Sequence, residues 1–175
     1  MKIKMLVLDV DSTLTDGKYY VNECGNITKC FFTRDFSALE ELHNKGVVII
    51  VVTNSIDNVI DEKIKTLPYT IYLIKGAVNK EQEIDSFILT SEVITWDNIA
   101  YIGDAENDIE CVEKAGFSCC PNDAIPEIKE KVDFVSTYNG GNGAVWEFAK
   151  EILKMKEIKN EDDSQGWIFV SRCSC

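Results

Sequence analysis

Two aspartates directly follow an apolar segment near the start of the chain. Residues Met5–Leu8 are all apolar, and Asp9 and Asp11 come next, in a segment that ends at Gly17. A buried strand has no structural need for acids at its tip, because an unpaired carboxylate is costly to bury. Carboxylates at the carboxyl end of a parallel strand lie where such sheets bind ligands, and their oxygens suit Mg²⁺. The pair favours metal-dependent phosphoryl transfer, with a solvated turn as the alternative.

A second polar segment and a lysine follow later apolar runs. Val47–Val52 is followed by Thr53 and Asn54, whose hydroxyl, amide and backbone groups can hold phosphate oxygens. An ordinary helix N-cap is the alternative for this segment. Lys80 opens a predicted helix, where its charge opposes the helix dipole, so its placement indicates another purpose. Lys75 is a competing candidate for the same role.

More acids follow the apolar run Ile99–Ile102. Asp104, Glu106 and Asp108 lie within five residues and repel one another unless a cation lies among them. The alternative is an acidic first turn of a helix, which the helix dipole favours. Together, the four polar segments predict one site at one edge of a sheet.

These segments need a scaffold of alternating strands and helices. Apolar runs alternate with stretches of amphipathic spacing, which predicts a doubly wound, Rossmann-like α/β fold: a parallel sheet with helices on both faces. The predicted strands are Met5–Leu8, Val47–Val52, Ile71–Ile74, Ile99–Ile102, Phe117–Cys120 and Phe134–Val135, and the predicted helices are Ser37–Asn44, Ile56–Thr66, Lys80–Leu89, Asn107–Lys114, Pro126–Lys131 and Val145–Met155.

One segment breaks this alternation. Lys18–Phe32 is typical of a β-hairpin, and because it follows the acidic pair we expect a flap over the site. No insertion is long enough for a separate cap domain. We expect one folded domain over residues 1–156 and a flexible acidic tail over 157–175, whose apolar patch Trp167–Val170 docks on the body or on a neighbour.

Composition restricts the partners. The 175 residues carry a net charge of −12, which argues against nucleic-acid and anionic-membrane partners, and no apolar run approaches the roughly 20 residues that span a bilayer. Seven cysteines without a paired CxxC spacing predict reduced thiols in a cytoplasmic protein, and we assign no metal to them.

The four polar segments resemble the haloacid dehalogenase superfamily of phosphohydrolases. The resembling motifs are DVDSTLTDG, VVTNS, the lysine of GAVNK and YIGDAENDIE. The chain is most similar to the capless 3-deoxy-octulosonate (KDO) 8-phosphate phosphatase branch, which includes sialic and KDN 9-phosphate phosphatases, and the likeness covers about residues 3 to 155.

This resemblance implies a role for each motif residue. Asp9 would attack phosphorus and form an aspartyl-phosphate, and Asp11 would move the proton. Mg²⁺ would be held by the carboxylates of Asp9 and Asp104 and by the backbone carbonyl of Asp11, with Asp108 in support. The phosphoryl oxygens would be held by Thr53, Asn54 and Lys80.

The resemblance also implies an assembly and a substrate class. The branch forms homotetramers, in which a flap and a neighbour's glycine-rich tail close the site, so Gly140–Ala144 would belong to that tail. A phosphorylated sugar acid is the implied substrate, and the substrate or lid candidates are Lys29, Arg34, Gly141, Asn142 and Trp146.

The chain also departs from the branch. Ser12 replaces a usual glycine, and we expect activity to survive provided that the backbone there needs no positive φ. The branch usually has Gly-Arg where this chain has Asn54 and Ser55, and it usually has arginines where this chain has Asn142 and Trp146. Arginine suits bidentate binding of carboxylate or phosphate, so these departures put KDO 8-phosphate itself in doubt. A non-catalytic oligomerisation or regulatory module, like the C-terminal region of CMP-sialate synthetases, is the main alternative. A receiver domain ranks last, because it leaves Asp11 and the hairpin unexplained.

Overall fold

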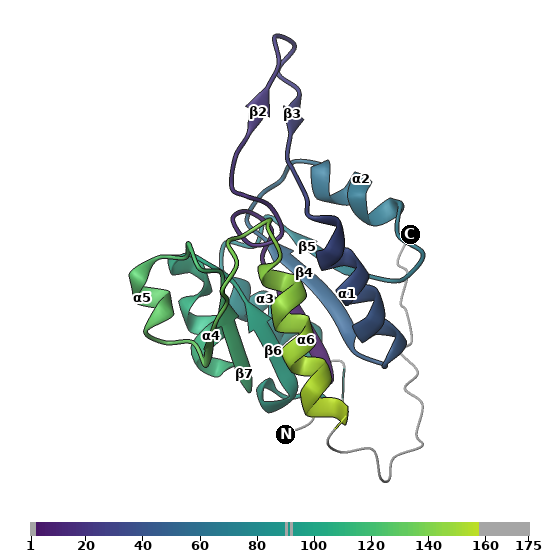
Figure 1. The fold of residues 1–175 in the computed structure, drawn as a ribbon, viewed down its shortest axis with the longest axis vertical. Coiled ribbons are helices and arrows are strands. Elements are labelled where there is room, and N and C mark those ends of the chain that lie inside the picture. Colours follow the sequence, from purple (N-terminus) through teal and green to yellow (C-terminus); the bar gives the residue numbers. More distant parts are fainter. Residues whose placement is uncertain (1–2, 90, 92, 158–175) are drawn as a thin grey trace.

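The computed structural model describes residues 3–89, 91 and 93–157. Six parallel strands form one sheet in the order β5-β4-β1-β6-β7-β8, with helices on both faces (Figure 1). The predicted doubly wound α/β fold is confirmed. The strands are β1 (Met5–Leu8), β4 (Val48–Thr53), β5 (Tyr72–Lys75), β6 (Ile99–Ile102), β7 (Phe117–Cys120) and β8 (Phe134–Val135).

The helices surround this sheet. They are α1 (Thr33–Asn44), α2 (Val59–Lys65), α3 (Lys80–Ile88), α4 (Ile109–Lys114), α5 (Pro126–Lys129) and α6 (Ala144–Glu157), with short 3₁₀ helices at Trp96–Asn98 and Glu106–Asp108. Each predicted helix is present, with ends displaced by a few residues. Helix α1 begins at Thr33 rather than at the predicted Ser37.

The central strand β1 lies where the winding of the sheet reverses. It pairs in parallel with β4 on one side and with β6 on the other. In such sheets, ligands bind beyond the carboxyl ends of the strands at this reversal point. The segments that follow β1 and β6, which contain Asp9 and Asp104, therefore meet at the expected place.

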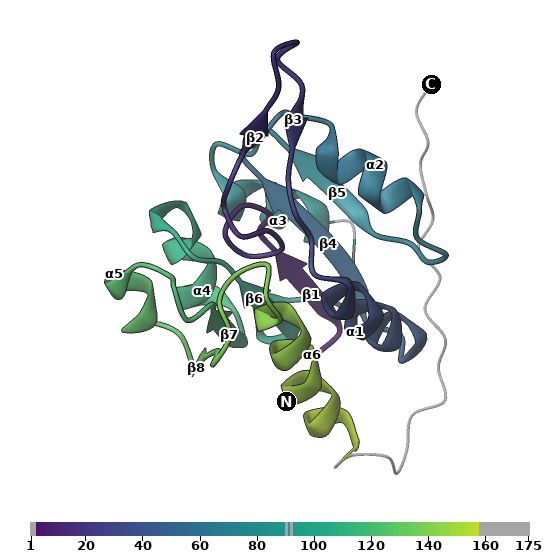
Figure 2. The same ribbon diagram turned by 45° about the horizontal axis from the view of Figure 1, so that its top comes forward.

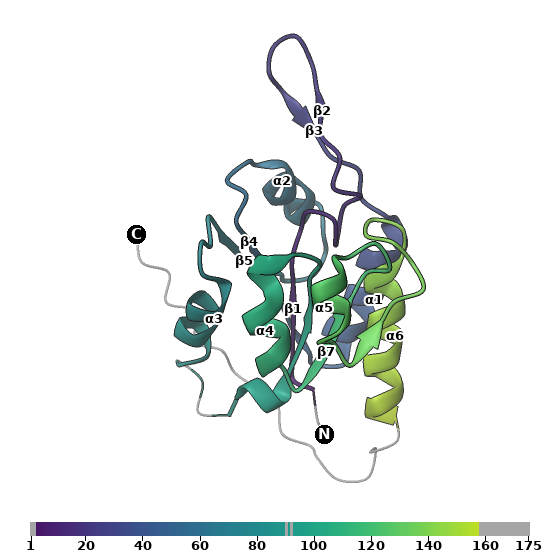
Figure 3. The ribbon, with the colours of Figure 1, turned by 90° about the vertical axis from the view of Figure 1, so that its left-hand side faces the viewer.

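Alternate residues of each strand face two separate cores. Leu6 and Leu8 of β1 pack in the core beneath α1 and α6, whereas Met5 and Val7 pack in the core beneath α3, α4 and α5. Figure 3 shows the two helical layers on opposite sides of the sheet. Because both faces are covered, the strands are apolar along most of their length, which is why the sequence reveals them.

The hairpin consists of β2 (Tyr20–Val21) and β3 (Ile27–Thr28) and stands out from the body next to the end of β1 (Figures 1 and 2). The ladder ends at Thr28, before the end of the predicted hairpin at Phe32. Lys29 leaves the ladder and turns its side chain inward, while Phe31 makes only a single bridge with Thr15.

The last described element is α6, which ends at Glu157. The predicted tail and its patch Trp167–Val170 lie outside the described residues apart from Glu157 itself. Within the described part of the chain, no helix has the length and apolar character that crossing a membrane requires.

Candidate active site

The loop after β1 places Asp9 at the floor of the site. The backbone N–H of Asp9 donates to the carbonyl of Ile102, so β1 and β6 still pair at this point (3.0 Å). The chain then turns tightly, because the carbonyl of Val10 accepts from the N–H groups of Leu14 and Thr15 at 2.9 Å each. The turn holds the Asp9 side chain at the carboxyl edge of the sheet.

Lys80 joins two of the predicted acidic residues. Its buried ammonium donates to Oδ1 of Asp9 and to Oδ1 of Asp108, each at 2.7 Å. The competing candidate Lys75 faces α2 instead, where it pairs with Asp61 at 2.7 Å. The lysine at the start of α3 is therefore the one that the fold brings to the site.

Asp108 is fully buried and accepts four hydrogen bonds. Besides Lys80, its Oδ1 accepts from the hydroxyl of Tyr101 (2.5 Å), and its Oδ2 accepts from the backbone N–H groups of Asp104 (3.0 Å) and Ala105 (3.2 Å). A Cβ at Gly103 would lie 2.3 Å from the Asp108 carboxyl carbon, so only glycine leaves room for this arrangement. Asp108 thus fixes both Lys80 and the loop that carries Asp104.

Burial dominates the electrostatics of these acids. It raises the pKa of Asp9 to about 6, although Lys80 acts in the opposite direction. Burial and the charges of Asp9 and Asp108 raise the pKa of Asp104 to about 7. Burial alone would lower the pKa of Lys80, but the Asp9 and Asp108 carboxylates outweigh it and raise that pKa. The single ammonium of Lys80 thus faces three neighbouring carboxylates, those of Asp9, Asp104 and Asp108.

This donor set fits a divalent cation. Asp9, Asp104 and Asp108 each present an oxygen, and these oxygens lie within 4.8 Å of one another. When all three are ionised, three negative charges and the single positive charge of Lys80 leave a formal charge of −2. Carboxylate oxygens with excess negative charge are the ligands that Mg²⁺ prefers. Because all four bonds of Asp108 are internal, Asp9 and Asp104 are the acids with capacity for the ion.

A pocket of about 190 Å³ opens above these residues. All of its lining residues belong to the predicted first, second and fourth motifs, and they are Asp9, Asp11, Ser12, Thr53, Asn54, Ser55, Asp104, Ala105 and Asn107. Thr53 is buried at the end of β4, and its hydroxyl accepts from the N–H of Ser55 (3.1 Å). Asn54 is exposed at the rim.

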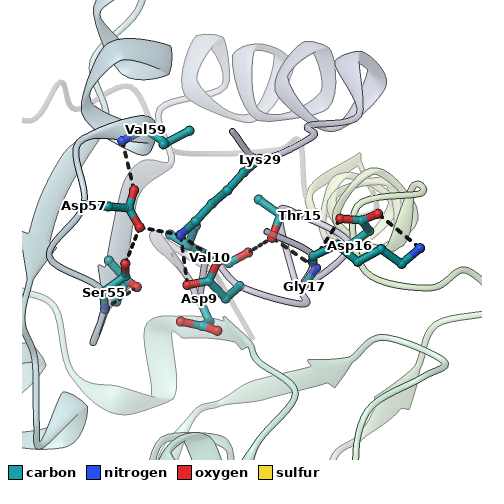
Figure 4. Close-up of polar contacts among 12 residues, drawn as sticks. Asp9, Val10, Thr15, Asp16, Gly17, Lys29, Ser55, Asp57 and Val59 are labelled. Atoms are coloured by element: carbon teal, nitrogen blue, oxygen red, sulfur yellow. Dashed lines mark hydrogen bonds and ion pairs between the residues drawn. The ribbon is translucent and has the colours of Figure 1, made fainter. Parts of the chain in front are cut away.

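The flap contributes a lysine to the same site. The Lys29 ammonium lies 2.8 and 3.1 Å from the two carboxylate oxygens of Asp11. It also lies 2.7 Å from Oδ2 of Asp57 (Figure 4). The ring of Tyr19 lies 4.8 Å from the same ammonium. Burial and the neighbouring Asp11 raise the pKa of the Tyr19 hydroxyl. The base of the flap therefore reaches the acid predicted to move the proton.

The other flap and lid candidates lie outside the pocket lining. Arg34 is exposed at the start of α1. Asn142 donates from its side chain to the carbonyl of Gly140 (2.9 Å), and Trp146 packs edge-on against Tyr138. Neither these residues nor Gly141 line the pocket.

The glycine-rich segment packs on its own chain. The N–H of Gly141 donates to the carbonyl of Thr13 (3.0 Å), and a Cβ at Gly140 would lie 1.7 Å from the carbonyl oxygen of Ser12. The segment leads directly into α6, inside the predicted domain over residues 1–156. Its glycines allow two backbone segments to touch, and the loop below them carries the first motif.

Our expectation for Ser12 was wrong in its premise. The backbone of Ser12 has φ of 60°, in the left-handed region that disfavours residues with a side chain. A glycine would adopt this conformation without strain. Ser12 therefore carries a local strain at the edge of the pocket.

Sequence reasoning missed two functional neighbours, Asp57 and Tyr101. Asp57 lies in a loop of ordinary turn composition, and its partner Lys29 is far away in the sequence. Tyr101 lies inside an apolar strand, and the strand pattern does not predict that its hydroxyl contacts Asp108. One clue was available, because a buried tyrosine hydroxyl requires a polar partner.

Comparisons with known proteins agree with this geometry. Residues 26–148 match the family model described as haloacid dehalogenase-like hydrolase. The chain is 31% identical over 163 residues to 3-deoxy-D-manno-octulosonate 8-phosphate phosphatase KdsC of Escherichia coli K12, covering 91% of this chain and 86% of that protein. It is also 30% identical to N-acylneuraminate cytidylyltransferase A of Danio rerio, covering 89% of this chain but only 36% of that protein.

A solved structure of a 3-deoxy-D-manno-octulosonate 8-phosphate phosphatase is also similar to this chain. The 3-deoxy-D-manno-octulosonate 8-phosphate phosphatase of Moraxella catarrhalis, in complex with magnesium, phosphate and KDO, superposes with a TM-score of 0.82 at 31% identity, and the match covers 87% of this chain and 86% of that one. The chain therefore belongs to the haloacid dehalogenase-like hydrolases, the superfamily that its four polar segments resemble.

Proposed function

We propose that this protein is a Mg²⁺-dependent phosphomonoesterase that acts on a phosphorylated sugar acid of the KDO 8-phosphate or sialic/KDN 9-phosphate type. The observation that carries the proposal is the meeting of Asp9 and Asp104 in one pocket at the reversal point of the sheet, with the buried Lys80 bonded to Asp9 beneath it. Phosphatases of this substrate class are among its relatives in sequence and structure.

The proposed chemistry proceeds in two displacements at phosphorus. Asp9 attacks the phosphoryl group to give an aspartyl-phosphate, and Asp11 donates a proton to the departing sugar oxygen. Asp11 then takes a proton from the water that hydrolyses the aspartyl-phosphate. Each displacement is thus easier than a direct attack by water on the ester.

Charge on the transferring group requires compensation. Lys80 has three N–H donors, and two of them bind Asp9 and Asp108, so one donor can face a phosphoryl oxygen. The Thr53 hydroxyl and the groups of Asn54 line the same pocket. In phosphoryl transfer, catalysis comes mainly from such positioning and electrostatic stabilisation.

Mg²⁺ would be held by the carboxylates of Asp9 and Asp104 and by the backbone carbonyl of Asp11, with Asp108 in support. When bound, the ion supplies charge that stabilises the transferring phosphoryl group. The formal charge of −2 at this cluster supports the assignment, because a divalent cation neutralises it.

The identity of the sugar acid depends on the pocket rim. Asn54, Asn142 and Trp146 cannot make the bidentate bonds to carboxylate that arginine makes. In this structure only Asn54 of the three lines the pocket. We therefore expect the carboxylate of the substrate to be recognised outside these three positions, and Lys29 at the base of the flap is the candidate cation, because it lies beside the pocket residue Asp11.

We also propose a homotetramer in the cytoplasm. Tyr20 and Val21 on the flap are 57% and 63% exposed, and Val21 lies opposite the exposed Ile27 in the hairpin ladder, which gives the flap an apolar surface. A neighbouring subunit would cover them. Size-exclusion chromatography with light scattering tests the assembly, and a monodisperse monomer at micromolar concentration would contradict it.

Phosphate release from a panel of phosphorylated sugars and sugar acids tests the proposed activity. We expect release with Mg²⁺ and with a preference for keto sugar acids, no release with a chelator, and loss of activity in Asp9→Asn. A matched control is Asp61→Asn, which removes an acid that pairs with Lys75 away from the pocket. Inert wild-type protein on every compound, or full activity in Asp9→Asn, would contradict the proposal.

A second candidate function is the non-catalytic module. The match to part of a cytidylyltransferase favours considering it, because a related region there belongs to a longer protein. Against it stands the buried ionic cluster, since a purely structural domain gains little from keeping three acids and a lysine together. The phosphate-release assay separates the two functions.

A further inference from the structure

Lys29 is buried although it belongs to an exposed hairpin. Its side chain is 1% exposed, while both neighbours in the sequence, Thr28 and Cys30, are exposed. A buried ammonium is costly unless anionic partners surround it. The inward turn of Lys29 therefore depends on its two carboxylate partners, Asp11 and Asp57.

The two partners come from different segments. Asp11 belongs to the loop after β1, and Asp57 belongs to the loop between β4 and α2. The ammonium of Lys29 lies between them, 2.8 Å from Asp11 and 2.7 Å from Asp57. One side chain thus ties the base of the flap to two loops at the pocket.

Asp57 is itself firmly held. Its Oδ1 accepts from the N–H of Val59 (2.9 Å) at the start of α2, and its Oδ2 accepts from the Ser55 hydroxyl (2.5 Å) and faces Lys29 (Figure 4). Capping of α2 requires only Oδ1. The second oxygen pairs both with Ser55 and with Lys29, so the local bonds to Val59 and Ser55 do not account for the ion pair with the flap.

We propose that Asp57 is a positioning residue of the active site, which holds Lys29 over Asp11 and thereby keeps the base of the flap closed. Asp57 does not touch the reacting atoms. It acts through Lys29, because the ammonium would otherwise be held by Asp11 alone and the flap would lose its attachment to the β4–α2 loop. The catalytic consequence rests on the proposed role of Asp11, whereas the flap attachment does not.

Limited proteolysis with trypsin measures directly, and without substrate, whether Lys29 stays paired with Asp11 and Asp57. The peptide bond after Lys29 becomes a trypsin site only when the Lys29 side chain leaves both carboxylates, whereas Lys18 on the same hairpin has a side chain that is 71% exposed. Cleavage after Lys18 therefore serves as an internal reference. The ratio of the two cleavage rates, followed by mass spectrometry, measures opening of the flap base in native protein.

The variant for this test is Asp57→Asn, which keeps an oxygen for Val59 and removes the charge facing Lys29. We expect cleavage after Lys29 to accelerate about tenfold relative to cleavage after Lys18. The matched control is Asp61→Asn, which removes another acid of the same region that pairs with Lys75 rather than with the flap. We expect the control to leave the ratio unchanged.

Steady-state kinetics distinguish the proposed role of Asp57 from a role in capping α2 alone. In the parent, Asp57→Asn should lower kcat/KM for a phosphorylated sugar acid about tenfold, and in a Lys29→Met background it should lower it less than about twofold. A local structural role of Asp57 would instead give the same loss in both backgrounds.

The outcomes are distinguishable. An unchanged cleavage ratio in Asp57→Asn, or equal acceleration at Lys18 and Lys29, would overturn the proposal whether or not the protein is a phosphatase. An equal kinetic loss in both backgrounds would also overturn it. Inert wild-type protein with the expected cleavage ratio would contradict the proposed function and leave the flap attachment supported.

Discussion

Asp35 is a fully buried acid with one satisfied oxygen. Its Oδ1 accepts from the backbone N–H of Trp146 at 2.8 Å, in the first turn of α6, and its Oδ2 has no hydrogen-bond partner among the described residues. Burial raises the pKa of Asp35 from 3.8 to about 7, against the opposing effect of the Trp146 bond. The folded protein therefore binds the Asp35 proton more tightly than the unfolded chain does.

The sign of the pH effect follows from this difference. A raised pKa in the folded state adds stability below pH 3.8, and that stability is lost as the pH rises towards about 7. At about 1.4 kcal/mol per pH unit, the whole interval corresponds to about 4 kcal/mol, of which about 3 kcal/mol falls between about pH 5 and pH 7. Asp35→Asn removes the titration and keeps an oxygen for Trp146.

Urea unfolding of the metal-free parent and of Asp35→Asn, across the pH range, tests this reasoning. Relative to the parent, the variant should gain about 3 kcal/mol in unfolding free energy between about pH 5 and pH 8. Other titrating groups are common to both proteins and cancel in the difference. A difference that stays constant over this range would refute the reasoning.

Glu147→Gln in the same helical turn provides a control of opposite sign. Burial alone would raise the pKa of Glu147, but hydrogen bonds from Ser136 and Thr137 outweigh it and lower that pKa. Glu147 therefore contributes stability that is present above its unfolded pKa and lost as the pH falls through its folded pKa. The deficit of Glu147→Gln should shrink in acid.

Three further substitutions test packing and hydrogen bonding around the site, each by urea unfolding. Gly140→Ala forces a Cβ onto the carbonyl of Ser12 and should cost at least about 3 kcal/mol, whereas Gly25→Ala, which has open space and only a strained φ, should cost about 1 kcal/mol. Ser12→Gly removes the strain at φ of 60° and should stabilise by about 1 kcal/mol; destabilisation would contradict the strain. Tyr101→Phe removes a bond to the buried Asp108 carboxylate and should cost about 2 kcal/mol, more than the roughly 1 kcal/mol for Tyr69→Phe, whose hydroxyl donates to a neutral carbonyl.

The fold was predictable because its signal is local. Strands β1, β6, β7 and β8 have the predicted bounds, and β1 and β6 are short apolar runs buried on both faces. The meeting of Asp9, Lys80 and Asp104 was also predictable, because the carboxyl ends of parallel strands share one edge. The fold class then brings residues together that are far apart in the sequence.

The remaining features depend on contacts that no local pattern encodes. The pairing of Lys29 with Asp57 joins two turn-like segments, and it also ends β3 early by turning Lys29 inward. Gly140 is required by the carbonyl of Ser12, which lies close to it only in the folded chain. Serine rarely adopts the left-handed backbone conformation that Ser12 has, so the residue type predicted an ordinary backbone there and the prediction was wrong.

The central claim is that Asp9 is the nucleophile of a phosphoryl transfer. Acid quenching of the Mg²⁺-loaded protein during turnover of KDO 8-phosphate or a sialic or KDN 9-phosphate, followed by peptide mass spectrometry, tests it most directly. We predict one added phosphoryl group on the tryptic peptide that spans residues 5–18, located on Asp9 and absent from Asp9→Asn. Active wild-type protein with the phosphoryl group on another residue, or Asp9→Asn that still turns over the same substrate at the wild-type rate, would contradict the account.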